Sequence, residues 1–255
     1  MPKNTAKARV HFLYKRLLKH YGPQHWWPAG TAWEMMVGAI LTQNTSWANV
    51  EKAISVLKKS KGLSIRAIAA MPRLRLEKLI RSSGYFRQKS KRLQLFAREM
   101  ERNPEFFRQL RGEGLLPPLW GKVGMGGCRR RLRPPTSILP HRGGGSIEDL
   151  RDRLLSLHGV GPETADSILL YAGGYPSFVV DAYTRRIGQR MGLFTSDNYL
   201  EVQTFFQDRL PREPALYNEF HALIVRHAKD ICTSRNPRCE ACPIRRHCAH
   251  GRRKL

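Results

Sequence analysis

Four of the five cysteines lie within the last 24 residues, and their spacing constrains the fold more than any other feature of the chain. They follow the pattern Cys232-x6-Cys239-x2-Cys242-x5-Cys248. Four thiolates at such short separations can ligate a cubane [4Fe-4S] cluster. Zinc is the alternative, although zinc sites with four cysteines usually contain two Cys-x2-Cys pairs, and only Cys239 and Cys242 form such a pair here. In either case a metal-type cysteine cluster indicates a reducing compartment.

The charge of the chain indicates its partner. Forty-five Lys and Arg residues stand against 20 Asp and Glu residues, which gives a formal net charge of +25 over 255 residues. Such an excess repels itself on a compact surface unless a polyanion binds, and nucleic acid is the usual polyanion. No apolar run reaches the length that a membrane-spanning helix needs. We therefore expect a nucleic-acid-binding protein without a membrane partner.

Apolar residues recur at helical spacing in most of the chain, which predicts an all-α fold. The first 33 residues contain no acid, as in many transit peptides, but the spacing of Val10, Leu13, Leu17, Leu18 and Tyr21 favours a docked first helix. Only residues 177–180 indicate extended chain. Further helices are expected over residues 35–41, 49–59, 65–71, 74–82, 88–102, 146–157, 162–172, 181–191, 199–208 and 214–229.

One segment departs from the helical pattern. Leu115–Gly145 contains seven Gly, five Pro, six Lys or Arg and no acid in 31 residues, without an apolar period. This composition predicts a disordered insertion, and the similar flanks 111–114 and 142–145 suggest a translated repetitive element. A basic loop that touches DNA is the alternative. Cys128 lies in this segment, so we exclude it from the cysteine cluster.

The sequence Leu157-His158-Gly159-Val160-Gly161-Pro162 predicts a tight turn between two helices. The two glycines permit close approach of a ligand, and Pro162 suits the first position of a helix. Free amides at the start of that helix could bind a DNA phosphate, directly or through a monovalent cation. A plain helix–turn–helix corner is the alternative.

Asp181 is the candidate catalytic residue. It lies twenty residues after Gly161, follows the apolar Val179 and Val180, and precedes a predicted helix with cations at Arg185 and Arg186. A carboxylate at a helix start can act in catalysis, whereas its structural role would be that of an N-cap.

The glycine turn, the Val-Asp pair and the terminal cysteines together resemble the helix-hairpin-helix DNA glycosylases of the endonuclease III superfamily. The resemblance extends from about Trp26 to Cys248 and is interrupted by the insertion. It implies two helical lobes: a six-helix barrel over residues 28–178 with the hairpin, and a [4Fe-4S] cluster lobe of residues 1–27 and 179–255. It also places the active site, with Asp181, in the cleft between the lobes.

Two departures from the family pattern narrow the expected chemistry. Bifunctional members carry a lysine nucleophile two residues after the second hairpin glycine, where this chain has Glu163, and a glutamate cannot form an imine. The adenine-mismatch branch carries a glutamate near Gly38-Ala39-Ile40, where this chain has no acid. An N-alkylated purine needs no such acid, because it already carries positive charge. The resemblance is thus nearest to the 3-methyladenine glycosylase branch.

Aromatic residues supply the expected base pocket. Trp27, Pro28 and Trp47 are candidates to stack on a flipped cationic base, although tryptophans more often belong to a core. Gln43 or Asn44 could fill the gap that the flipped nucleotide leaves. Lys89, Lys91 and Arg92 are candidate phosphate contacts or a solvated helix face, and Lys229 is either a pocket residue or a surface residue.

We therefore expect a monomeric, cytoplasmic, nucleoid-associated bacterial DNA glycosylase that acts on damaged double-stranded DNA. The damaged base would flip out, and ionised Asp181 would stabilise the sugar cation and activate water, so that only the N-glycosidic bond is hydrolysed. The alternatives are a bifunctional glycosylase and abasic-site lyase for damaged pyrimidines, a non-catalytic DNA-binding protein, and a decayed gene product disabled by the insertion.

Overall fold

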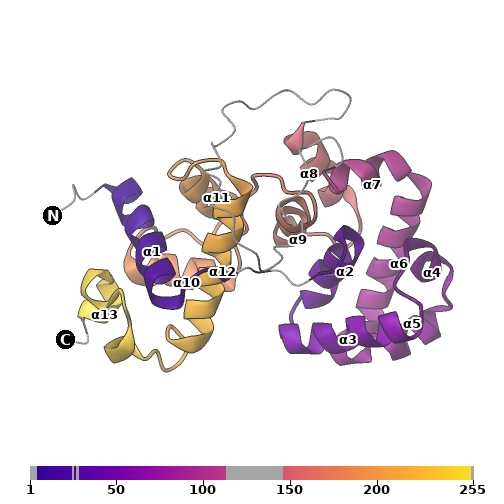
Figure 1. Ribbon diagram of the computed structural model, residues 1–255, viewed down its shortest axis with the longest axis horizontal. Coiled ribbons are helices and arrows are strands. Elements are labelled where there is room, and N and C mark those ends of the chain that lie inside the picture. Colours follow the sequence, from indigo (N-terminus) through magenta and orange to yellow (C-terminus); the bar gives the residue numbers. More distant parts are fainter. Residues whose placement is uncertain (1–4, 25, 27–28, 113–145, 254–255) are drawn as a thin grey trace, which may run out of the picture. The chain divides into compact units, whose positions relative to one another are not determined.

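The computed structural model describes residues 5–24, 26, 29–112 and 146–253, and Figure 1 shows the order of their helices. The described residues contain helices and no strand, so the all-α prediction is confirmed. No described helix is long and apolar enough to cross a membrane. The predicted insertion Leu115–Gly145, with Cys128, lies outside the described residues.

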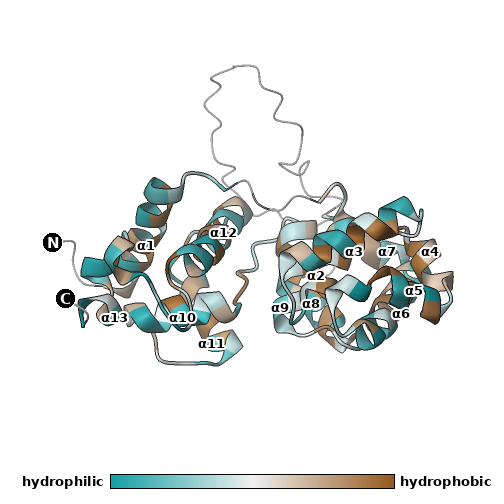
Figure 2. Ribbon diagram, turned by 90° about the horizontal axis from the view of Figure 1, so that it is seen from below, coloured by the Kyte–Doolittle hydropathy of each residue, from teal (hydrophilic) through white to brown (hydrophobic). Residues whose placement is uncertain are grey.

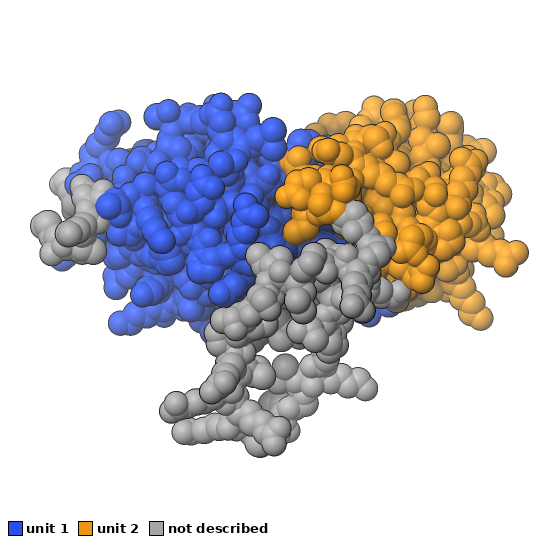
Figure 3. All heavy atoms as spheres, turned by 90° about the horizontal axis from the view of Figure 1, so that it is seen from above, with its two compact units in different colours: residues 1–31, 161–171, 175–255 blue, residues 32–160, 172–174 orange. Residues whose placement is uncertain are grey.

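The chain forms two compact units (Figure 3). Unit 1 contains residues 1–31, 161–171 and 175–255, and unit 2 contains residues 32–160 and 172–174. This division differs from the expected lobes in residues 28–31, 161–171 and 175–178. The assignment of residues 28–178 to a six-helix barrel remains a proposal.

Unit 2 is organised around a buried helix, α2 (Ala32–Thr42), and an amphipathic helix, α6 (Phe86–Arg102). All nine residues from Trp33 to Leu41 of α2 are buried, and α6 contributes an apolar face in which Phe96 stacks on Trp33 with ring centroids 6.0 Å apart. The other helices of unit 2 carry both hydrophilic and hydrophobic residues (Figure 2), as is typical of helices that each bury one apolar face. The helices of unit 2 are α2 (Ala32–Thr42), α3 (Trp47–Lys59), α4 (Ile65–Ala70), α5 (Arg73–Leu79), the 3₁₀ turn η1 (Arg81–Ser83), α6 (Phe86–Arg102), α7 (Pro104–Leu110) and α8 (Ile147–Ser156).

Unit 1 is organised around α12. An aromatic core forms where Phe178 stacks on Phe206 at 4.5 Å and packs edge-on against Tyr217 and Phe220 of α12. The helices of this unit are α1 (Ala6–Tyr21), α9 (Pro162–Ser167), the π-helical turn η2 (Ile168–Ala172), α10 (Ala182–Met191), α11 (Tyr199–Gln207), α12 (Pro214–Asp230), η3 (Cys239–Ala241), η4 (Arg245–His247) and α13 (Ala249–Arg252).

The first helix is docked, as its periodicity predicts. Val10, Leu13 and Leu17 of α1 are fully buried, and the helix packs against α12. Arg9 of α1 also donates to the carbonyl oxygens of Met191 and Gly192 at the C-terminal end of α10. The N-terminal segment therefore belongs to the packed structure of unit 1.

Candidate active site and metal centre

The extended segment before Asp181 is held by side chains of α11. Tyr199, Gln203 and Gln207 are spaced four residues apart and therefore lie on one face of that helix. Gln203 Nε2 donates to the Phe178 carbonyl at 2.8 Å, the Phe178 N–H donates to Gln207 Oε1 at 3.0 Å, and the Val180 N–H donates to the Tyr199 hydroxyl at 3.4 Å. These bonds satisfy a buried backbone without a partner strand and fix the position of the next residue, Asp181.

Asp181 is the N-cap of α10. Its Oδ1 accepts a hydrogen bond from the Thr184 N–H at 2.7 Å, and its Oδ2 lies 3.5 Å from His221 Nε2 on α12. The Asp181 side chain is 13% exposed, so the carboxylate is largely enclosed but remains accessible to a small molecule such as water. The structural role as N-cap and a catalytic role are compatible, because each oxygen has a different neighbour.

Two aromatic residues hold His221 in place. The hydroxyl of Tyr171 on η2 lies 2.5 Å from His221 Nδ1, and the ring of Trp26 stacks on the His221 ring at 5.8 Å with an interplanar angle of 22°. Both His221 and Tyr171 are buried. The ring of His221 therefore has one nitrogen bonded to a phenol and the other directed at the Asp181 carboxylate.

Electrostatics favour the ionised form of Asp181. Burial alone would raise the pKa of this carboxyl, but the neighbouring His221 imidazole and the hydrogen bond from the Thr184 N–H outweigh burial and leave the pKa below its ordinary value. Glu163, at the start of α9, keeps solvent access. Partial loss of its hydration and the negative charge of Asp181 raise the pKa of Glu163. The site thus contains two carboxyl groups whose pKa values move in opposite directions.

The glycine turn is fixed within unit 2 on its N-terminal side. Gly159 has a φ of +84°, which favours glycine, and its carbonyl accepts from Gln43 Nε2 at 3.0 Å. Gln43 Oε1 in turn accepts from Arg92 Nη1 at 2.5 Å, so the end of α2, the turn and α6 are linked by one amide side chain. Gly161 is the N-cap of α9, and a Cβ added there would meet no atom within 4 Å.

The cations of α6 differ in their exposure, so they do not form the uniform solvated helix face that was one of the two alternatives predicted from the sequence. Lys89 is 1% exposed, and its Nζ donates to the Leu41 carbonyl at 2.9 Å and the Ser83 carbonyl at 2.6 Å. Its predicted role as a phosphate contact is therefore wrong, because the ammonium group is used to close the end of α2. Lys91 is exposed and Arg92 is half-buried, and Lys229 is an exposed surface residue.

The structure describes part of the expected base pocket. Trp27 and Pro28 lie outside the described residues, so their pairing with Trp47 stays a prediction. Trp47 is the first residue of α3, half-buried, and its Nε1 donates to Glu51 Oε1 at 2.8 Å. Asn44 is exposed at the turn between α2 and α3, with a φ of +58°. Asn44 and Gln43 are the candidates to fill the gap that the flipped nucleotide leaves. Asn44 has the more exposed side chain, whereas the side chain of Gln43 is hydrogen-bonded to Gly159 and Arg92.

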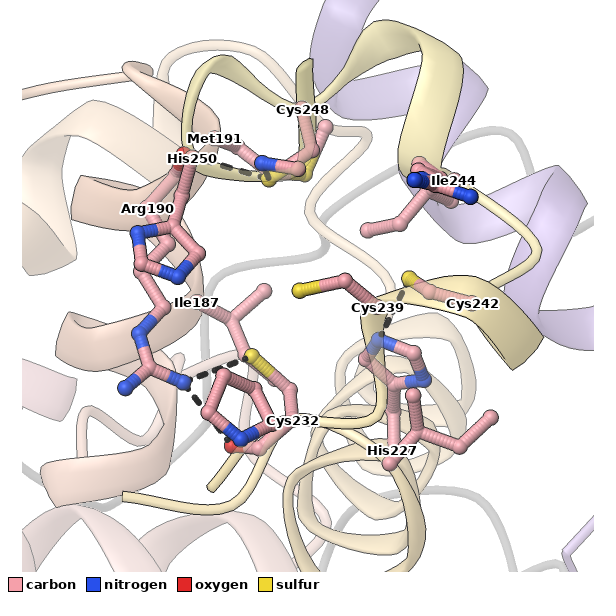
Figure 4. A pocket seen from close by; sticks show the side chains of 14 residues that line it. Ile187, Arg190, Met191, His227, Cys232, Cys239, Cys242, Ile244, Cys248 and His250 are labelled. Atoms are coloured by element: carbon pink, nitrogen blue, oxygen red, sulfur yellow. Dashed lines mark hydrogen bonds between the residues drawn. The ribbon is translucent and has the colours of Figure 1, made fainter. Parts of the chain in front are cut away.

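The four predicted cysteine ligands line one hollow in unit 1 (Figure 4). Cys232 follows α12, Cys239 is the first residue of η3, Cys242 directly follows η3, and Cys248 follows η4, so short turns bring together thiols that span 17 residues of sequence. The rest of the lining combines apolar side chains with basic ones: Ile187, Met191, Ile231 and Ile244 with Arg190, His227, Arg245 and His250. Thiols in a hollow lined by apolar and cationic side chains fit a bound anionic iron–sulfur cluster.

The hydrogen bonds at the hollow also fit an anionic cluster. Arg190 Nη1 donates to Cys232 Sγ at 3.3 Å, and the Gly251 N–H donates to Cys248 Sγ at 3.4 Å. Such donors stabilise negative charge on ligating sulfur. Burial raises the pKa of the Cys242 thiol to about 11, so ligation must displace its proton. Helix α10 connects Asp181 with the cluster ligands, because Asp181 is its N-cap and Arg190, which donates to Cys232 Sγ, lies in its last turn.

Comparison with known proteins decides the family. A model described as the HhH-GPD superfamily of base excision DNA repair proteins matches residues 37–212. The chain belongs to this superfamily. A second model, the iron–sulfur binding domain of endonuclease III, matches residues 232–248, which include all four cysteine ligands. The chain is therefore a DNA repair glycosylase of the HhH-GPD superfamily with the [4Fe-4S] binding segment of endonuclease III.

Relatives of this superfamily cover nearly the whole chain. A protein of Methanocaldococcus jannaschii named "Putative DNA repair glycosylase" is 39% identical over 247 residues, which cover 96% of this chain and 98% of that protein. A trapped endonuclease III–DNA covalent intermediate has a TM-score of 0.73 at 21% identity, with 97% of this chain and 98% of that chain covered. The H. pylori 3-methyladenine DNA glycosylase bound to 1,N6-ethenoadenine has a TM-score of 0.65 at 25% identity, with 88% and 97% covered.

Sequence reasoning missed the residues that surround Asp181. His221 occurs within an apolar helix and Tyr171 near the end of another, so each resembles an ordinary core residue in the sequence. The available signal was a histidine between Phe220 and the apolar run from Ala222 to Val225, because a buried histidine needs a hydrogen-bond partner. Nothing in the sequence identifies that partner.

Proposed function

We propose that this HhH-GPD glycosylase is monofunctional, binds damaged double-stranded DNA and excises alkylated purines such as 3-methyladenine. The observation that carries the proposal is the enclosed Asp181 carboxylate, whose pKa lies below its ordinary value although burial alone would raise it. An ionised carboxylate can stabilise a developing sugar cation and accept a proton from water, and it cannot protonate a leaving base.

The chain lacks both the general acid and the lysine nucleophile that other branches of the superfamily carry. This absence supports a substrate whose base leaves without being protonated. The only acid of α2 is Glu34, which is buried and paired with Lys58 at 2.6 Å, so it serves the structure of unit 2. Glu163 occupies the position of the family's lysine nucleophile and has no amine. A cationic alkylated base departs as a neutral molecule without an acid, and without an imine the strand is not cut.

The mechanism proceeds from DNA docking to hydrolysis. Amides of Gly159, Val160 and Gly161 would contact a phosphate, with a monovalent cation bridging the turn and the phosphate, and exposed cations such as Lys91 would add affinity that depends on salt. Asn44 would fill the gap in the duplex as the damaged base leaves the stack. Trp27, Pro28 and Trp47 would contact the cationic base.

Hydrolysis breaks the N-glycosidic bond and an O–H bond of water, and it forms a C–O bond on the sugar and an O–H bond on Asp181. The electron pair of the N-glycosidic bond leaves with the cationic base, which becomes neutral, and Asp181 stabilises the resulting sugar cation. Water then attacks the anomeric carbon, and its proton passes to the Asp181 carboxylate. When bound, the cluster held by Cys232, Cys239, Cys242 and Cys248 supplies a structural link between the C-terminal turns and α10.

The H. pylori relative supports the choice of substrate class, because that protein is a 3-methyladenine glycosylase bound to a modified adenine and covers 88% of this chain.

A lesion panel tests the proposal. Duplexes that contain 3-methyladenine, uracil or an oxidised pyrimidine are incubated with the protein and then divided into samples with and without alkali. Strand cleavage only after alkali, and only with the alkylated duplex, is expected. Cleavage without alkali on the oxidised pyrimidine would instead establish a bifunctional enzyme.

A further inference from the structure

We infer that Tyr171 and His221 form a positioning relay, in which the Tyr171 hydroxyl holds the His221 ring so that its Nε2–H faces the Asp181 carboxylate. The inference rests on the proposed function of Asp181 and extends it to two residues that do not themselves contact DNA in the mechanism above.

The geometry defines the relay. The Tyr171 hydroxyl lies 2.5 Å from His221 Nδ1, and His221 Nε2 lies 3.5 Å from Asp181 Oδ2. Burial, and then the negative charges of Asp181 and Glu163, raise the pKa of Tyr171 well above its usual value, so the phenol keeps its proton. A neutral imidazole whose Nδ1 accepts a hydrogen bond from this phenol must carry its own hydrogen on Nε2.

The relay works in both charge states of the ring. If His221 is neutral, the Tyr171 hydroxyl donates to Nδ1 and Nε2–H points at the carboxylate. If His221 is protonated, both ring nitrogens carry hydrogen and the phenol oxygen accepts from Nδ1. The excluded tautomer is the one with a bare Nε2, whose lone pair would face an ionised carboxylate across 3.5 Å.

Other groups around the site make the relay necessary. Asp181 lies within electrostatic range of the acidic Glu163 of α9, whereas the His221 ring and Arg185 of α10 act on Glu163 as positive charges. The Thr184 N–H binds only Oδ1 of Asp181. Without His221, burial and the neighbouring Glu163 would favour protonation of Asp181, and a protonated carboxyl can neither stabilise a sugar cation nor accept a proton from water.

A series of His221 variants tests the relay through a pH profile. Single-turnover excision of an alkylated base by the wild type should be constant from pH 8 down to about pH 5, because the pKa of Asp181 is low. In His221→Leu the rate should fall on the order of 100-fold at pH 6 and recover as the pH rises. In His221→Gln the amide can supply an N–H near the position of Nε2, so the loss should be smaller. A uniform loss without a pH-dependent limb, or equal losses in both variants, would overturn the relay.

Tyrosine variants test the other hydrogen bond. Tyr171→Phe should lower excision on the order of 10-fold, since the His221 ring loses the hydrogen bond that holds it against Asp181. Tyr217→Phe is the matched control, because the Tyr217 hydroxyl is also buried in unit 1 but has no hydrogen-bond partner among the described residues. The control should keep the wild-type rate. Equal rates for both variants would contradict the relay.

A measurement without catalysis separates the relay from the proposed function. The ¹³C resonance of the Asp181 carboxyl, assigned by its loss in Asp181→Asn, should report an ionised group at pH 6 in the wild type and a protonated group in His221→Leu. An ionised group in both proteins would refute the relay even if excision is observed. A protonated group in His221→Leu, together with no excision of any lesion by the wild type, would support the relay and reject the proposed function.

Discussion

The side chain of Arg92 lies directly against Gly159, so that a Cβ added at position 159 would meet Arg92 Nε at 2.7 Å. The same arginine donates to Gln43, which donates to the Gly159 carbonyl. The first glycine of the hairpin is thus required both by its positive φ and by a neighbour that is itself held in place. The second glycine, Gly161, has neither constraint.

Gly159→Ala should lower the free energy of unfolding by roughly 1–3 kcal/mol through backbone strain alone, and further through displacement of Arg92. Urea unfolding measures the change. Gly174→Ala is the matched control, because Gly174 also has a positive φ of +68° but has no atom within 4 Å of the added Cβ. If both variants lose the same stability, the contact with Arg92 has no energetic importance.

Gly161→Ala should leave the melting temperature unchanged, since the added methyl group meets open space. We nevertheless expect its Kd for duplex DNA to rise on the order of 10-fold, because the methyl group would block close approach of a phosphate to the turn. A salt titration of binding by fluorescence anisotropy measures this change. Unchanged affinity would exclude the turn as a phosphate site.

Lys89→Met tests the buried ammonium group. Burial, followed by the positive charge of Arg92, lowers the pKa of Lys89 to about 8, below its value in the unfolded chain. Between pH 8 and the pKa of Lys89 in the unfolded chain, the unfolded state binds more protons than the folded state. The free energy of unfolding of the wild type must therefore rise with pH relative to that of the variant, by about 3 kcal/mol at most. Urea unfolding of both proteins across this range measures the difference. A difference that does not vary with pH would contradict the lowered pKa.

The helical part of the fold could be predicted because apolar periodicity reports which face of a helix is buried. Asp181 and Ser146 are N-caps, one residue before α10 and α8, so the expected starts were accurate to one residue. The short helix α7 was not predicted, and its seven residues are too few to establish a period.

The candidate site was predictable only where it is encoded locally. The hairpin and the cysteines are compact motifs, whereas the relay joins Tyr171 and His221 across 50 positions. The bracing of Phe178 by Gln203 and Gln207 is equally non-local, and glutamines on a helix ordinarily indicate a solvated face. Lys89 shows the same limit, because its burial depends on carbonyl groups at the ends of other elements.

Glu163→Lys tests whether position 163 faces the reacting sugar. The variant would place an amine at the start of α9, close to the charge of Asp181. We expect it to form an imine with an abasic site, which borohydride reduction converts to a stable protein–DNA crosslink, whereas the wild type gives none. Glu163→Gln is the control. A crosslink in the wild type would show that another amine acts as nucleophile.

The central claim is that ionised Asp181 carries the excision of an alkylated base. Asp181→Asn tests it most directly, because asparagine is an equally good N-cap for α10 and should preserve the fold. Single-turnover excision from a duplex with 3-methyladenine is measured beside DNA affinity. We predict that the variant binds like the wild type and excises at least ~1,000-fold more slowly. Excision by the variant at the wild-type rate would contradict the account.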